Sequence, residues 1–283
     1  MSCRRYGGCL DSHPTAKAAL SAPGNGPQGL QNPKETGVTT ESNQAGTVLV
    51  TGAGRRLGRA IARDFASRGW RVAAHYNTSA AEAEALVGEI RDAGGEAMAL
   101  EADLTDAEAL APLVQACSAA IGPVTCLVNN AASFEWDSVE SVDLAGWDAQ
   151  LDLNLRAPVF LAQAFAAALP ADRQGSVINL LDQKIWRLNP DCFSYTVSKS
   201  ALWTATQIMA QALSPRIRVN AVGPGPVFRS HRQTQAEFEA ECHQTLLGQG
   251  VRPEEICAAI RFLVENPSVT GQMIAVDSGQ HLV

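Results

Sequence analysis

The stretch "VLVTGAGRRLGRAIA" (residues 48–62) joins an apolar run to a helical pattern through a glycine-rich turn. Gly52, Gly54 and Gly58 permit a tight turn and a close backbone approach, and the start of the following helix offers unpaired N–H groups to a pyrophosphate. Many strand-to-helix turns need glycine for backbone reasons alone, so the turn is weak evidence by itself. Its place at the first strand–helix junction of a parallel sheet favours nucleotide binding.

Short apolar runs alternate with longer helical patterns from Thr47 to the end of the chain. Such alternation indicates βαβ units and a parallel sheet, and right-handed crossovers make the sheet doubly wound. We therefore predict one Rossmann-type α/β domain over 47–283, with a seven-stranded parallel sheet and helices on both faces. The expected strands are 47–52, 70–76, 96–104, 124–131, 175–181, 216–225 and 271–279. The expected helices are 55–69, 79–95, 106–122, about 147–169, about 190–213 and 253–266.

Composition excludes several classes of protein. The 283 residues are 46% hydrophobic and 18% charged, with a formal net charge of −7, which argues against a surface built for nucleic acid. The sequence has no apolar run of about 18 residues, so we predict no membrane-spanning helix. The seven scattered cysteines have no metal-ligand spacing, which is typical of reduced thiols in a cytoplasmic protein and predicts no metal site.

The first 46 residues differ from the rest, because they are rich in Gly, Pro, Ser, Asn and Gln and lack a periodic apolar pattern. Such a segment cannot bury enough surface to offset its ordering entropy, so we predict a disordered tail over 1–46. A targeting peptide is the alternative interpretation of "MSCRRYGGCL", although this stretch lacks the apolar core of a secretory signal.

The end of the second predicted strand indicates which nucleotide is bound. An NAD site usually has an Asp or Glu there to hold the ribose 2′-OH, whereas "AAHYNTSAAEA" (73–83) has no carboxylate before Glu82. An added 2′-phosphate needs cationic and hydrogen-bonding partners, so we predict NADPH/NADP+ rather than NADH. The residues expected to bind it are His75, Asn77, Thr78, Ser79, Arg55 and Arg56.

A tyrosine and a lysine with i, i+4 spacing, Tyr195 and Lys199, share one face of the helix expected at 190–213. A phenol with a pKa near 10 is a poor acid–base group at neutral pH, and a neighbouring ammonium stabilises its ionised form. An ordinary amphipathic helix explains the same spacing, so the pair gains weight only from the other motifs.

With "TGAGRRLG" (51–58), "NNAA" (129–132), the Tyr195–Lys199 pair and "NAVGPG" (220–225) in this order, the chain resembles the short-chain dehydrogenase/reductase family. The resemblance implies an NADP(H)-dependent oxidoreductase acting on a small molecule. It implies that Tyr195 is the proton donor, that Lys199 lowers the pKa of Tyr195 and binds the nicotinamide ribose, and that Asn154 holds a water in the proton relay. The other implied cofactor contacts are Leu57, Asp103, Leu104, Asn130, Ala131, Ala132, Pro224, Gly225 and Val227.

Two positions differ from the usual pattern of this family, and they indicate which of its branches the chain resembles. Arg56 stands where the family's turn normally has glycine, and Asp182 stands where its catalytic serine normally stands. With "HYNTS" (75–79) and Phe134, these changes resemble the pteridine reductase branch. There the arginine reaches the substrate and the cofactor phosphates, the phenylalanine stacks on the pterin ring, and the aspartate replaces the serine.

Three positions differ from that branch as well. Thr78 replaces a frequent basic residue, Ala132 replaces a serine beside the nicotinamide, and Arg229 lies where a cofactor-binding threonine is usual. These differences bear on the pattern of phosphate contacts.

Asp182 is the residue that indicates which kind of bond the protein reduces. A serine hydroxyl donates to a developing alkoxide, whereas a carboxylate repels one and accepts hydrogen bonds from the N–H groups of a pterin. Burial would raise the pKa of Asp182, and its proton would pass through Tyr195 to a ring nitrogen while carbon receives hydride. Phe134 supplies a flat surface for a bicyclic ring, or packs beneath a loop. The expected reaction is reduction of a C=N bond of a pterin, dihydropteridine or folate-like heterocycle.

Two alternatives stay open. The chain is otherwise a carbonyl reductase that tolerates Asp182, or a cofactor-binding regulatory protein with weak catalysis, against which the intact Tyr195, Lys199 and Asn154 count. The stretch 223–250 lies where such folds place a substrate lid, with Phe228, Arg229, His231 and Arg232 as candidate contacts, and a solvated, mobile loop is the alternative interpretation. Trp136 and Trp186 either line the pocket or serve packing. The resemblance also implies a homotetramer that packs through 147–169 and 190–213.

Overall fold

A computed structural model describes residues 46–230 and 232–283 of the chain. The predicted disordered tail (1–46) therefore lies, except for Gly46, outside the described residues, as does the candidate contact His231. The boundary of the domain at Thr47 stays a prediction. Within the described residues, no helix is both long and apolar enough to span a bilayer.

The centre of the fold is one seven-stranded sheet in the order β3-β2-β1-β4-β5-β6-β7. Every pair of neighbouring strands is parallel, and Val48 of β1 lies between Val72 of β2 and Cys126 of β4. The order reverses between β1 and β4, which makes this the point where ligands bind in doubly wound sheets. The strands are β1 (Thr47–Val50), β2 (Arg71–Tyr76), β3 (Ala97–Glu101), β4 (Val124–Asn129), β5 (Gly175–Leu180), β6 (Ile217–Pro224) and β7 (Met273–Val276).

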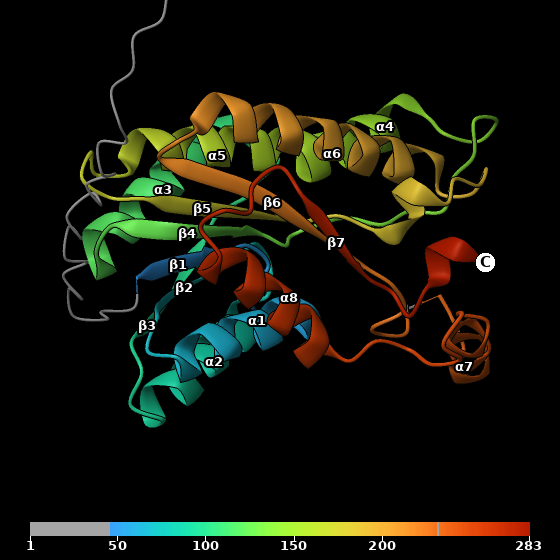
Figure 1. Ribbon diagram of the computed structural model, residues 1–283, viewed down its shortest axis with the longest axis horizontal. Coiled ribbons are helices and arrows are strands. Elements are labelled where there is room, and N and C mark those ends of the chain that lie inside the picture. The colour runs from blue at the N-terminus through green and yellow to red at the C-terminus, as the bar shows by residue number, and fades with distance from the viewer. Residues whose placement is uncertain (1–45, 231) are drawn as a thin grey trace, which may run out of the picture. The chain divides into compact units, whose positions relative to one another are not determined.

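Helices cover both faces of the sheet, as predicted (Figure 1). One layer holds α1, α2 and α8, and the other holds α3, α4, α5 and α6. The helices are α1 (Arg56–Ser67), α2 (Ala80–Asp92), α3 (Ala107–Ile121), α4 (Leu144–Leu151), α5 (Ala157–Ala168), α6 (Phe193–Leu213), α7 (Gln235–His243) and α8 (Pro253–Glu265). Three short turns complete the set: η1 (Asp152–Arg156), η2 (Gln183–Trp186) and η3 (Gln280–Leu282).

The core explains why the strands read as continuous apolar runs. All four residues of β1 are buried, because apolar side chains of α1, α2 and α8 pack on one face and those of α3, α5 and α6 on the other. Helix α1 contributes Ile61 and Phe65 on one stripe, at the spacing that its sequence predicts. The predicted fold class is confirmed.

Two elements differ from expectation. The helix predicted at about 147–169 is interrupted by a π-helical turn, η1. The segment after β6 contains a helix, α7, that sequence periodicity does not predict, since none of its residues is buried. A capping box between Thr234 and Glu237 stabilises its first turn instead.

Candidate active site

A cleft of about 1080 Å³ opens at the carboxyl ends of the strands, where the sheet order reverses. Its lining comes from the loops that follow β1 to β6, together with Gln280 near the C-terminus. Every residue predicted for the site lines this cleft except Gly54 and Asn154. The expected lid contacts are divided: Phe228 lines the cleft, whereas Arg229 and Arg232 do not. Among the tryptophans, Trp136 lines it and Trp186 does not.

The glycine turn after β1 is fixed by contacts that only glycine permits. Gly52 has a φ of +63°, and a Cβ on Gly58 would lie 2.2 Å from the carbonyl oxygen of Gly52. The Thr51 hydroxyl accepts hydrogen bonds of 2.9 Å from the N–H groups of Asn130 and Ala131, which ties the turn to the end of β4. Gly54 lies against α2, since a Cβ there would approach the Ser79 hydroxyl.

Helix α1 begins in this turn without a side-chain cap, because the guanidinium of Arg55 at the N-cap has no acceptor atom for the helix N–H groups. The N–H groups of its first turn therefore lack side-chain acceptors, which is the arrangement that binds phosphate in other proteins. The Arg55 guanidinium instead donates to Glu82 over 2.7 Å. Asn77, Thr78 and Ser79 line the cleft beyond β2, and none of the lining residues between positions 52 and 79 carries a carboxylate.

His75 differs from its expected role as a phosphate donor. Its side chain is buried, its Nδ1 accepts from the N–H of Gly52 over 3.1 Å, and its Nε2 lies 3.0 Å from the carbonyl of Ala102. Nδ1 must be unprotonated to accept, so Nε2 carries the proton and donates to Ala102. Burial lowers the pKa of His75, which favours this neutral form. His75 positions the turn, and both ring nitrogens are already engaged.

Arg56 has a left-handed backbone, with a φ of +48°. This conformation suits glycine and costs other residues about 1–2 kcal/mol, which explains why the resembling family has glycine here. Nη2 of Arg56 donates to the carbonyls of Phe228 and Arg229, each over 3.1 Å, and its guanidinium lies 5.4 Å from the centre of the Phe228 ring. Arg56 thus connects the glycine turn to the segment after β6.

The predicted catalytic groups meet at the end of β5. Tyr195 and Lys199 share a face of α6, and the Tyr195 hydroxyl donates to Oδ2 of Asp182 over 3.0 Å. Nζ of Lys199 donates to the carbonyl of Leu180 over 2.8 Å and lies 5.7 Å from the centre of the Tyr195 ring. Tyr195 and Lys199 are both buried.

Burial and mutual charge set the proton affinities of this group. Burial raises the pKa of Asp182 and lowers the pKa of Lys199 to about 8. The pKa of Tyr195 is raised well above its usual value by burial first and by the charge of Asp182 second. The lowering of this pKa by Lys199, which the family resemblance implies, therefore stays a prediction.

The role expected of Asn154, holding a water in the proton relay, stays a prediction. Asn154 is fully buried in η1, behind the cleft wall, where its Oδ1 accepts from the N–H of Ser133 over 2.9 Å. Its Nδ2 donates to the Ser133 carbonyl and to Gln150, each over 2.9 Å, and also to the Ser198 hydroxyl. The widened π-helical turn brings Asn154 to this position, as such turns often do at functional sites. Asn154 holds the loop after β4 in place.

That loop carries two aromatic rings toward the cleft. The ring centres of Phe134 and Tyr195 are 4.8 Å apart and meet edge to face at 82°. Trp136 follows at 6.2 Å from Phe134, again edge to face, and half of its side chain is exposed. The rings therefore extend from the buried phenol to the mouth of the cleft.

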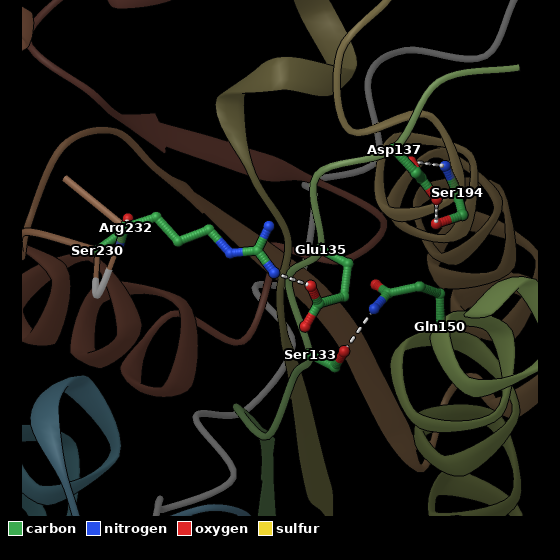
Figure 2. Close-up of polar contacts among 7 residues, drawn as sticks. All are labelled: Ser133, Glu135, Asp137, Gln150, Ser194, Ser230 and Arg232. Carbon is green, nitrogen blue, oxygen red and sulfur yellow. Dashed lines mark hydrogen bonds and ion pairs between the residues drawn. The ribbon is translucent and has the colours of Figure 1, made fainter. Parts of the chain in front are cut away.

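Side chains of Asp137, Gln150 and Glu135, none of which was predicted, also hold the loop (Figure 2). Asp137 accepts from the N–H and the hydroxyl of Ser194, the former over 3.0 Å, at the start of α6. Gln150 donates to the Ser133 hydroxyl, and Glu135 pairs with Arg232 beyond β6. These contacts join residues far apart in the chain, so no local sequence pattern signals them.

Comparison with known proteins identifies the family. A family model described as enoyl-(acyl carrier protein) reductase matches residues 52–281. The chain is similar to the structure of FolM alternative dihydrofolate reductase 1 from Brucella canis complexed with NADP: the sequence identity is 47%, the TM-score 0.83, and the match covers 85% of this chain and 95% of that chain.

Two further proteins show the breadth of the resemblance. The structure of a blue fluorescent protein from a metagenomic library in complex with NADPH is 31% identical, with a TM-score of 0.77 over 84% of this chain and 99% of that chain. The 3-oxoacyl-(acyl-carrier-protein) reductase of Synechocystis sp. is 31% identical over 239 residues, which are 83% of this chain and 96% of its own length. Because these matches run from the first glycine turn to the segment after β7, the chain belongs to the short-chain dehydrogenase/reductase family of oxidoreductases.

Proposed function

We propose that this oxidoreductase uses NADPH to reduce a C=N bond in a dihydropterin or folate-like heterocycle. The observation that carries the proposal is the hydrogen bond from Tyr195 to Asp182, beside the ring of Phe134, in the cleft. The likeness to FolM alternative dihydrofolate reductase 1, at 47% identity, supports the same substrate class.

The donor set of the cleft fits NADPH. The uncapped start of α1 offers N–H groups for the pyrophosphate, and Asn77, Thr78 and Ser79 offer donors for the 2′-phosphate without a carboxylate to repel it. Asp103 and Leu104 lie beyond β3, where the adenine would bind, and Lys199 lines the cleft, where it would hold the nicotinamide ribose. Similar proteins crystallised with NADP or NADPH support this assignment.

When bound, NADPH supplies a hydride to the carbon of the C=N bond. Tyr195 then gives its hydroxyl proton to the nitrogen, so that one hydride and one proton convert C=N to CH–NH. Asp182 accepts a hydrogen bond from an N–H group of the heterocycle and holds the phenol in place before transfer. An alkoxide forming at this point would meet the negative charge of Asp182, which disfavours ketones.

A carbonyl reductase is the second candidate, and the similarity to the Synechocystis 3-oxoacyl-(acyl-carrier-protein) reductase favours it. The two candidate functions differ in the bond that is reduced beside Asp182, which is C=N in the first and C=O in the second. A regulatory protein that only binds the cofactor is the third, and it predicts tight NADPH binding without turnover.

The test follows NADPH oxidation with dihydrobiopterin, dihydrofolate and a panel of ketones, for the wild type and Asp182→Ser. We expect turnover of the pteridines, and a fall of about 100-fold or more in the variant, as expected for loss of acid–base assistance. Ketone turnover without pteridine turnover, or a variant that improves on every substrate, would favour the carbonyl reductase.

We also infer a homotetramer in the cytoplasm. Large apolar side chains remain exposed on α5 and α6, where Phe160 and Ile208 are 47% and 59% accessible, and these are the helices expected to pack between subunits. Light scattering of the wild type and of Ile208→Glu tests the assembly, since the variant should dissociate. Cell fractionation tests the location.

A further inference from the structure

The half of the cleft that follows β5 carries two cations without a matching carboxylate. Lys184 and Arg187 both line the cleft, in and directly after the short turn η2. Among the residues with described structure, Nζ of Lys184 has one acceptor, the side-chain oxygen of Asn189, over 3.4 Å. Within the residues that the structure describes, the Arg187 guanidinium has no hydrogen bond, ion pair or ring contact.

The carboxylates that line this half are already occupied by other donors. Asp182 accepts from Tyr195 and from the N–H of Lys184, and Glu135 pairs with Arg232. Glu241 accepts from the side chains of Gln233 and Gln280, over 2.8 and 3.0 Å. These donors, apart from Arg232, are neutral and leave the charges of Asp182 and Glu241 in place, but within the described residues none of these carboxylates pairs with the Arg187 guanidinium, which therefore stays available to an anion.

These cations lie away from the expected phosphate sites of the cofactor. The phosphate donors follow β1 and β2, whereas η2 follows β5, on the other side of the point where the sheet order reverses. Asp182 immediately precedes η2 and caps it by accepting from the N–H of Lys184 over 2.8 Å. The segment thus leads from the reacting groups to an exposed Arg187 at the surface.

We propose that Lys184 and Arg187 form a subsite for a carboxylate that the substrate carries outside its heterocycle. The preferred substrate is then a folate-type dihydropteridine with an anionic tail, rather than a dihydropterin with a neutral side chain. Trp136, half-exposed on the same cleft, gives a ring against which an aromatic spacer between heterocycle and carboxylate packs. This inference rests on the proposed function and names the substrate class within it.

The test compares KM for dihydrofolate and for dihydrobiopterin in wild type, Arg187→Gln and Arg187→Lys. Loss of one exposed ion pair raises KM for dihydrofolate about fivefold, and leaves KM for dihydrobiopterin and for NADPH unchanged. Arg187→Lys restores part of the loss, and added salt weakens the wild-type preference. Arg63→Gln removes an equally exposed charge on α1, outside the cleft, and is the matched control.

Equal changes for both substrates, or no change for either, would overturn the subsite. Calorimetric binding of dihydrofolate to the NADP+ complex gives the same comparison without turnover. The two proposals can therefore be refuted separately. If dihydrofolate binds in a manner that depends on Arg187 but is not reduced, only the proposed reaction is refuted. If both substrates are reduced and neither KM changes when Arg187 is replaced, only the subsite is refuted.

Discussion

The two halves of the cleft are built in different ways. The phosphate-binding part of the cofactor half comes from residues 52–79, where the glycines and the backbone N–H groups that follow β1 shape the surface. The substrate half comes from three separate loops, after β4, β5 and β6, and side chains make its surface: Phe134, Asp182 and Phe228 are examples.

This difference determines how each half responds to change. A backbone surface depends on close approach, so adding one methyl group disrupts it. A side-chain surface depends on hydrogen bonds and ion pairs between distant segments, so single substitutions weaken it by graded amounts. The following substitutions test this comparison.

Gly58→Ala should have the largest effect. The new Cβ would lie 2.2 Å from the Gly52 carbonyl oxygen and 2.6 Å from Nδ2 of Asn130, so the turn and α1 must separate. We expect loss of measurable NADPH binding and about 1–3 kcal/mol of destabilisation, by fluorescence titration and urea unfolding. Gly88→Ala is the control, since nothing lies within 4 Å of its added Cβ and a helical alanine stabilises by up to about 1 kcal/mol. Similar losses in both variants would contradict the close-approach argument.

Asp182→Asn should lower kcat for pteridines about 100-fold and move the alkaline limb of the pH profile. Lys199 is charged below its pKa of about 8, and the negative charge of Asp182 raises that pKa. Removing the charge lowers the pKa of Lys199 further, so activity is lost at a lower pH than in the wild type. Profiles of kcat/KM from neutral to alkaline pH measure the shift. A limb that stays in place would mean that Lys199 is not the titrating group.

Asp137→Ala should cost about tenfold in kcat/KM. Asp137 caps α6 from outside the helix, because Cys192 at its N-cap has a φ of +56° and gives no side-chain cap. Loss of a cap costs about 1–2 kcal/mol and loosens the helix start that carries Tyr195. Asp143→Ala removes a comparable cap from α4 and should lower the melting temperature without a matching loss of activity. Equal losses of activity in the two variants would assign Asp137 a purely structural role.

Disruption of the Glu135–Arg232 pair should have the smallest effect. Both side chains are about half-exposed, and such pairs contribute less than about 1 kcal/mol. We expect Glu135→Gln to raise KM for the substrate less than fivefold and to leave NADPH binding unchanged. A double-mutant cycle with Arg232→Gln isolates the pair, since additive effects would show that it contributes nothing.

The sequence predicted the cofactor half well, because both strand–helix alternation and the glycine turn are local patterns. It named Asp182 and Phe134 only through a family resemblance, which also gave weight to the spacing of Tyr195, and it missed what holds these residues. Asp137 and Glu135 act through contacts across distant segments, which leave no periodic signal. His75 was predicted to be a free donor, because a sequence does not distinguish an exposed histidine from a neutral, buried one whose two ring nitrogens bond to backbone groups.

The π-helical turn η1 has a consequence for how the chain tolerates length changes. A π turn holds one residue more than an α turn, and one residue corresponds to about 100° of rotation around the axis. The extra residue lets α4 face α6 while α5 faces α3 along one nearly continuous rod. Deleting a single residue from 152–156 would remove this rotation, so that α4 and α5 would present their buried faces in the same direction around the common axis. Either α5 would then turn its apolar stripe out of the core, or Asn154 would leave the loop that it anchors.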